Sequence, residues 1–128
     1  MTDLSAIYRD YIDCLNNRKL QHLSLFVHDD VVHNNRPFGL AGYTGMLQQN
    51  FADIPDLYFT IQLMITENNY VASRLGFDCT PKGEFLGIPV HGRKVVFTEN
   101  VFYLFREGKI QEVWSVVDKA AIETQIQA

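Results

Sequence analysis

The chain has 128 residues and a formal charge of −4 at pH 7. A chain of this length buries about two thirds of the surface that its unfolded form exposes, so we expect one domain over residues 1–128 that folds without disulfides or metal. The 11 basic residues are dispersed among 15 acidic ones, which excludes the basic patch of a nucleic-acid-binding protein.

The sequence also indicates in which cellular compartment the protein is expected. No apolar run approaches the roughly 18 residues of a membrane span, and no signal segment is recognisable, so we expect a cytoplasmic protein with no membrane partner. The cysteines, Cys14 and Cys79, match no metal or redox spacing. They predict free thiols in a reducing compartment.

The first part of the chain predicts three helices. Residues 3–18 carry apolar side chains at helical spacing, with Asp3 as a plausible N-cap. A second, shorter helix is expected from Leu20 to Phe26 and a third from about Ala41 to Asp53, with a brief extended segment over residues 31–33 between them.

From Leu57 onward the apolar period changes from 3.6 to 2, which indicates antiparallel strands joined by hairpins. The expected strands and the short helical tail that follows them are 57–66, 70–80, 92–105, 109–118 and 119–128. This order predicts an α+β fold in which three N-terminal helices pack on a curved antiparallel sheet and leave a pocket at the mouth of a cone. The 92–105 strand is apolar on both faces, so we expect the helices to cover one face and a second copy of the chain, in a homodimer, to cover the other.

The chain resembles the SnoaL-like polyketide cyclases of the NTF2-like superfamily. The resemblance rests on Val32-His33-Asn34, on GEFLGIPVHGR at residues 83–93 and on GKIQEVWSVVD at residues 108–118. It implies an NTF2-like, cystatin-like cone that is usually dimeric. It also implies ring closure by intramolecular aldol condensation without metal or cofactor, with Asp118 at the position of the family's acid/base aspartate.

Asp118 is the leading catalytic candidate. At the end of an apolar strand beside Trp114, a carboxylate would be partly desolvated, which raises its pKa toward a value useful for proton transfer. The alternative interpretation is that Asp118 caps the C-terminal helix.

The neighbours of Asp118 depend on the turn near Gly108. A two-residue loop would place Glu99 on the face of Asp118 and Trp114, whereas a three-residue loop would place Asn100 and Phe102 there. We expect the three-residue loop, because it gives the face that the family uses. Glu99 should then point away, as an interface or solvent-side charge.

Further candidates are polar groups that could position a ligand. Arg74 shares the parity of an inward-facing strand residue, although an ion pair with Asp78 or Glu112 is equally compatible with the pattern. His33 is a candidate base or hydrogen-bond donor, whereas Tyr43 is expected in the pocket wall or in the plain core. His28 and His33 lie near acidic residues, but no third metal ligand occurs at a recognisable spacing, so we expect no metal.

These residues lead to two hypotheses. The first is a cofactor-independent acid/base enzyme of the cyclase or isomerase type, acting on a hydrophobic small molecule that carries a carbonyl group. Asp118 would transfer the proton, and the substrate would contact a set of wall and polar residues: Trp114, Phe102, Tyr43, Arg74, Asn100 and His33. The second is a non-catalytic domain that binds an apolar ligand, which Leu104 favours because the resemblance implies a polar residue at its position.

Overall fold

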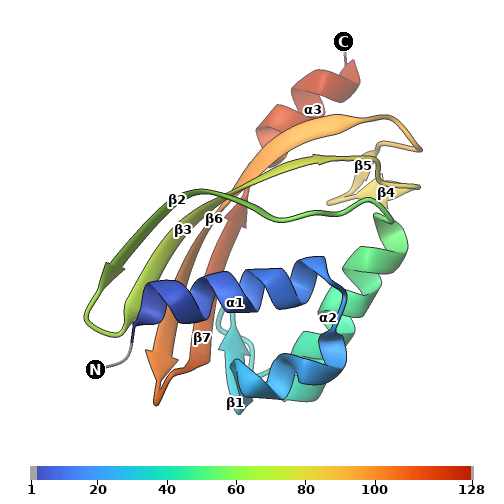
Figure 1. Ribbon diagram of the computed structural model, residues 1–128. Coiled ribbons are helices and arrows are strands. Elements are labelled where there is room, and N and C mark those ends of the chain that lie inside the picture. Colours follow the sequence, from blue (N-terminus) through green and yellow to red (C-terminus); the bar gives the residue numbers. More distant parts are fainter. Residues whose placement is uncertain (1–2, 128) are drawn as a thin grey trace.

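The computed structural model describes residues 3–127. In chain order the elements are α1 (Leu4–Asn16), the 3-10 helix η1 (Leu20–Leu25), β1 (Val27–His33), α2 (Gly39–Asp53), β2 (Thr60–Glu67), β3 (Tyr70–Cys79), β4 (Glu84–Phe85), β5 (Ile88–Pro89), β6 (Val95–Arg106), β7 (Lys109–Val117) and α3 (Lys119–Gln127). Five strands form one curved sheet in the order β1-β7-β6-β3-β2, while β4 and β5 form a separate small hairpin. Helices α1 and α2 lie on the concave side of the sheet (Figure 1).

The α+β fold class expected from the sequence is confirmed, with two differences in detail. Only two α-helices precede the long strands, because the second expected helix is a 3-10 turn and the third α-helix follows the sheet. The sheet is mixed, since β1 runs parallel to β7 whereas the other pairs are antiparallel.

Helix α1 forms as its apolar spacing predicts. The carboxylate of Asp3 caps it, accepting hydrogen bonds from the backbone N–H groups of Ser5 (3.1 Å) and Ala6 (3.3 Å). Its buried side chains share one face: Tyr8, Tyr11, Ile12, Cys14 and Leu15. This stripe presses two tyrosines into the concave side of the sheet.

The β6–β7 hairpin sets which side chains of β7 face inward. Arg106 pairs with Lys109, so the loop holds only Glu107 and Gly108, whose φ angles are 54° and 77°. The expected three-residue loop was therefore wrong, because both loop residues adopt the left-handed conformation that a tight two-residue turn needs. Beyond the turn, Gln111 forms a β-bulge and shifts the later pairing by one residue.

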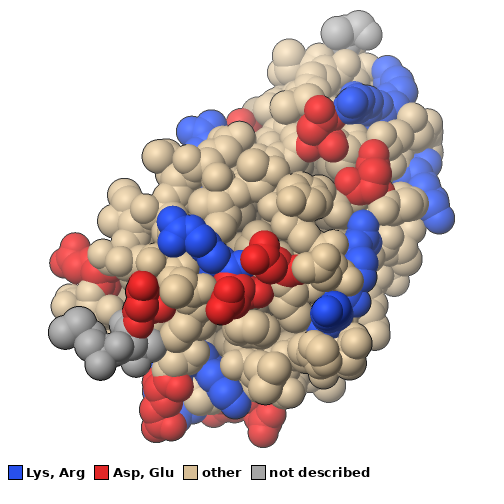
Figure 2. All heavy atoms as spheres, in the orientation of Figure 1, with Lys and Arg blue, Asp and Glu red and all other residues tan. Residues whose placement is uncertain are grey.

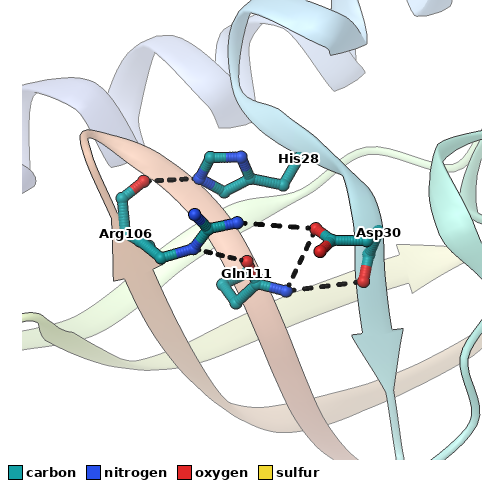
Figure 3. A network of polar contacts seen from close by, with 4 residues as sticks. All are labelled: His28, Asp30, Arg106 and Gln111. Carbon is teal, nitrogen blue, oxygen red and sulfur yellow. Dashed lines mark hydrogen bonds and ion pairs between the residues drawn. The ribbon is translucent and has the colours of Figure 1, made fainter.

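A polar network ties this bulge to β1 (Figure 3). Gln111 accepts a hydrogen bond from Arg106 Nε (2.8 Å) and donates one to Asp30 Oδ1 (3.3 Å). The Arg106 guanidinium lies 3.6 Å from the same carboxylate oxygen, and His28 Nε2 donates to the Arg106 carbonyl oxygen (2.6 Å). The unpaired residue of the bulge is thus held by side chains of both neighbouring strands, Asp30 of β1 and Arg106 of β6.

The two faces of the sheet differ in cover. Odd-numbered residues of β6 face the helices and are buried: Val95, Phe97, Val101, Tyr103 and Phe105. On the outer face large apolar side chains remain exposed, including Ile65 (65%), Phe102 (57%) and Val116 (71%). The outer face therefore carries an apolar surface that this chain alone does not cover.

The distribution of charged side chains on the surface agrees with the dispersed charges of the sequence. On the face shown in Figure 2, acidic and basic side chains are interspersed, and neither sign covers a continuous area. Cys14 and Cys79 are free and buried. Within residues 3–127, no helix combines the length and apolar character needed to cross a membrane.

Candidate functional site

The concave side of the sheet encloses a cavity of about 520 Å³. This volume lies within the usual range for small-molecule sites, about 300–1,000 Å³. The apolar part of its wall comes from both helices and the inner face of the sheet: Leu15, Met46, Leu47, Ile54, Leu57, Phe59, Leu75, Phe77, Phe97, Val101 and Val113. Phe85 and Leu86, from the β4–β5 hairpin, and Val116 and Val117, at the end of β7, also line the cavity.

Glu99, on β6, supplies the carboxylate of this wall. It is the one acidic residue among the described residues that line the cavity, and within residues 3–127 it takes part in no ion pair. Burial raises the pKa of Glu99, while a hydrogen bond from the Ser115 hydroxyl acts in the opposite direction. A carboxylate with a raised pKa in an apolar cavity is a candidate for proton transfer.

Asn34 holds Ser115 in place from the end of β1. Its carboxamide accepts a hydrogen bond from the Ser115 backbone N–H (2.8 Å) and donates one to the Ser115 carbonyl oxygen (3.2 Å). The Asn34 backbone N–H also donates to the carbonyl oxygen of Val113 (2.9 Å). Asn34 thereby fixes the segment of β7 that presents the Ser115 hydroxyl to Glu99.

His33 and Tyr43 lie on the cavity wall, as the sequence analysis expected. The His33 ring stacks on Phe38, with ring centroids 5.5 Å apart, and meets Tyr43 edge to face at 6.0 Å. Burial lowers the pKa of His33 below its ordinary value of 6.5, so its imidazole is neutral at pH 7. The Tyr43 hydroxyl forms a hydrogen bond of 2.7 Å with that of Tyr11, which lines the same cavity.

Comparisons with known proteins place the chain in a family. The sequence profile of the SnoaL-like polyketide cyclase family matches residues 5–126. The crystal structure of a SnoaL-like polyketide cyclase from Agrobacterium tumefaciens strain C58 is 52% identical, with a TM-score of 0.97 over 98% of this chain and 99% of that one. This chain belongs to the SnoaL-like polyketide cyclase family.

More distant structures share the fold of this SnoaL-like protein. IdmH from Streptomyces antibioticus is 24% identical, with a TM-score of 0.85 over 99% of this chain and 100% of that one. TsrD from Streptomyces laurentii is 21% identical, with a TM-score of 0.85 over 98% of each chain. No curated protein sequence matches the chain.

Four residues expected inside the cone of the SnoaL-like fold lie elsewhere. Phe102 is opposite Trp114, and both line a groove on the outer face of the sheet. Asn100 and Arg74 are opposite one another and exposed on that same face. The expected inward placement was wrong because β6 is apolar on both faces, so hydrophobicity alone did not show which face the helices cover.

Asp118 has an exposed side chain and lies outside the set of cavity-lining residues. Its carboxylate accepts a hydrogen bond from the backbone N–H of Ala121 (3.1 Å) at the start of α3. This is the helix-capping geometry expected under the alternative interpretation of Asp118. The expected desolvated position beside Trp114 was wrong. The catalytic role of Asp118 stays a prediction, and the experiment below sets it against Glu99.

Sequence reasoning missed Glu99, Ser115 and Tyr11 as members of the site. Glu99 was expected to point away, yet it faces the cavity with Phe97 and Val101. A signal existed, because Glu99 is the single charged residue among the odd-numbered positions of β6, which are otherwise apolar. An isolated acid within an apolar strand face indicates a functional group more often than a solvated one.

No resident metal is indicated by the side chains of this site. Within the described part of the chain, residues 3–127, no group of three or more His, Cys, Asp or Glu side chains is arranged to hold a metal ion. His28 instead donates to the Arg106 carbonyl oxygen, and Asp30 belongs to the network at the bulge.

Proposed function

We propose that the chain is a cofactor-independent acid/base enzyme of the cyclase type, and that Glu99 transfers the proton. The observation that carries this proposal is the carboxylate of Glu99, which has no ion-pair partner within residues 3–127 and lies in the wall of an apolar cavity of about 520 Å³. Membership of the SnoaL-like polyketide cyclase family supports the reaction class. The apolar wall favours a hydrophobic substrate that carries a carbonyl group.

The proposed steps balance without a co-reactant. Glu99 takes a proton from the carbon next to a carbonyl group, and the electron pair of that C–H bond forms an enolate. The enolate carbon then attacks a second carbonyl carbon of the same molecule, forming the new C–C bond and an alkoxide. The proton held on Glu99 returns to the alkoxide, so the enzyme is restored.

The first step is testable without knowledge of the natural substrate. Exchange of the methyl protons of 2-acetylnaphthalene for deuterium, followed by NMR in D₂O, reports proton abstraction next to a carbonyl group. We expect the protein to accelerate this exchange and Glu99→Gln to reduce the acceleration by about 10²- to 10⁴-fold, the usual contribution of a general base. Because Glu99 must be ionised to act, the rate should fall as pH drops through its raised pKa.

Asp118→Asn separates the two candidate carboxylates, because asparagine preserves the helix cap. Retained exchange in this variant would agree with Glu99 as the base, whereas loss of exchange in Asp118→Asn alone would assign the role to Asp118. Stoichiometric binding of the ketone with no more exchange than Glu99→Gln shows would instead favour a non-catalytic binding domain.

We also propose that the outer face of the sheet forms a homodimer interface. Its exposed apolar side chains include Leu63 (59%), Ile65 (65%) and Phe102 (57%). A groove lined in part by Tyr70 and Trp114 adjoins them. A two-fold interface pairs one such patch with its own copy and so removes both from water.

A further inference from the structure

Two hydrogen-bonded pairs of buried tyrosines include three residues of the cavity wall, Tyr11, Tyr43 and Tyr103. Tyr8 donates to the hydroxyl of Tyr103 (3.3 Å), and the hydroxyls of Tyr11 and Tyr43 are 2.7 Å apart. Tyr11 and Tyr43 both line the cavity, and both side chains are almost fully buried, at 1% and 3% exposure. The short Tyr11–Tyr43 pair therefore borders the space that a ligand would occupy.

A count of hydrogens shows that this pair has spare donor capacity. Two hydroxyls carry two hydrogens, and the bond between the two oxygens uses one of them. Within residues 3–127, neither oxygen has another hydrogen-bond partner. One buried O–H hydrogen is thus left without a protein acceptor, an arrangement that costs free energy unless an acceptor enters the cavity.

We propose that the Tyr11–Tyr43 pair donates this hydrogen to the carbonyl oxygen of the cavity ligand. The proposal rests on the proposed function for its catalytic meaning: negative charge moves onto that oxygen when Glu99 removes the neighbouring proton. The donated hydrogen stays on the tyrosine and its bond to the oxygen strengthens as the charge develops. The hydrogen bond inside the pair polarises the donating hydroxyl further.

The electrostatics of the cavity keep both hydroxyls protonated. Burial raises the pKa of Tyr11 and of Tyr43, and the negative charge of Glu99 acts in the same direction on both. Neither hydroxyl therefore loses its proton to Glu99 at neutral pH. The site can hold a base and a hydrogen-bond donor in one cavity without the two neutralising each other.

Two ligands of matched shape test the inference: 2-acetylnaphthalene labelled with ¹³C at the carbonyl, and 2-isopropylnaphthalene, which has no acceptor. Binding is measured by calorimetry and the carbonyl stretch of the bound ketone by infrared difference spectroscopy. The variants are Tyr11→Phe, Tyr43→Phe and the double variant. Tyr8→Phe is the matched control, because Tyr8 is a buried tyrosine of the same helix as Tyr11 that does not line the cavity.

In the wild-type protein we expect the carbonyl stretch to move to lower frequency than in an apolar solvent. The single variants should lose part of this shift and the double variant all of it. Ketone binding should weaken by about 2- to 10-fold in the double variant, the usual effect of one hydrogen bond, while binding of 2-isopropylnaphthalene stays within about 2-fold. Tyr8→Phe should leave both measurements unchanged.

A shift that survives in the double variant, equal weakening of both ligands, or the same loss in Tyr8→Phe would overturn the inference. If the double variant does not fold, the partial loss of the carbonyl frequency shift in the two single variants tests the inference instead. The exchange assay with the wild-type protein separates this inference from the proposed function. A pair-dependent shift in a protein that catalyses no exchange would retain the donor role and overturn the enzymatic one.

Discussion

At the scale of single residues, the distinctive feature of the cavity is the carboxylate of Glu99, whose negative charge is poorly solvated because the side chain is buried. Glu99 receives a hydrogen bond from Ser115 and no ion pair among the described residues. Its pKa is raised by burial, so the folded state favours the protonated form more than the unfolded state does. The residue that we propose for catalysis is thus also one that weakens the fold at neutral pH.

Glu99→Gln should therefore stabilise the protein at neutral pH. Ionised Glu99 costs stability above its raised folded-state pKa, and this cost disappears below the unfolded-state value of about 4.3, where the group is protonated in both states. Urea unfolding of both proteins at pH 8, 6 and 4 should show a stability gain for Glu99→Gln at pH 8 that vanishes by pH 4. A gain that is independent of pH would contradict the raised pKa.

Asn34→Ala should raise the pKa of Glu99 further. Loss of the two hydrogen bonds to the Ser115 backbone loosens the residue whose hydroxyl lowers that pKa. The measurement is the carboxyl ¹³C chemical shift of Glu99 as a function of pH. Asn35→Ala is the matched control, because Asn34 and Asn35 are adjacent, exposed and both at positive φ (46° and 65°). Equal pKa changes in both variants would rule out action through Ser115.

At the scale of elements, the sequence predicted what local periodicity determines. The cap and apolar face of α1 and the strands β2, β3, β6 and β7 follow from spacing and turn residues. The face of β7 does not, because the bulge at Gln111 offsets a two-residue turn by one residue. The later pairing is therefore the one expected for a three-residue loop, although the loop itself is shorter. No local propensity distinguishes these two routes to one register.

Glycine-to-alanine substitutions should have opposite effects on stability in the β6–β7 turn and in helix α2. Gly108→Ala should destabilise the protein by about 1–2 kcal/mol, because alanine is strained at the φ of 77° that Gly108 adopts. Gly45→Ala should stabilise it by about 0.5–1 kcal/mol, because Gly45 is exposed within α2 and an added Cβ meets nothing within 4 Å. Both are measured by urea unfolding, and effects of the same sign would contradict this view of the hairpin.

At the scale of the whole molecule, the curved sheet has two apolar faces, one covered by α1 and α2 and the other open. The sequence indicated two covered faces but not which of them holds the site. The position of the helices over the odd-numbered face of β6 depends on packing between segments far apart in the chain. For this reason Phe102 and Trp114 were expected on the wrong side of the sheet, whereas His33 and Tyr43 do lie on the cavity wall.

The proposed dimer gives a prediction at this scale. Phe102→Arg should convert the dimer to a monomer, because it places a charge within the apolar outer face, where Phe102 is 57% exposed. Leu25→Arg is the control, since Leu25 is 64% exposed but lies on η1 and not on a strand of the outer face. Sedimentation velocity should show a monomer for the first variant and a dimer for the wild type and the control. A wild-type monomer, or a dimer that persists in Phe102→Arg, would refute the interface.

The bulge at Gln111 makes the cavity wall sensitive to chain length rather than to side-chain identity. Since β7 alternates between its faces, regular pairing from the two-residue turn without the bulge would exchange Val113, Ser115 and Val117 for Glu112, Trp114 and Val116 along the inner face. One residue inserted between the bulge and Val113 would thus replace a whole row of cavity contacts in one step, whereas deletion of Gln111 would leave the row unchanged. An engineer seeking a new specificity in this fold could vary the length of the strand at this position before varying its residues.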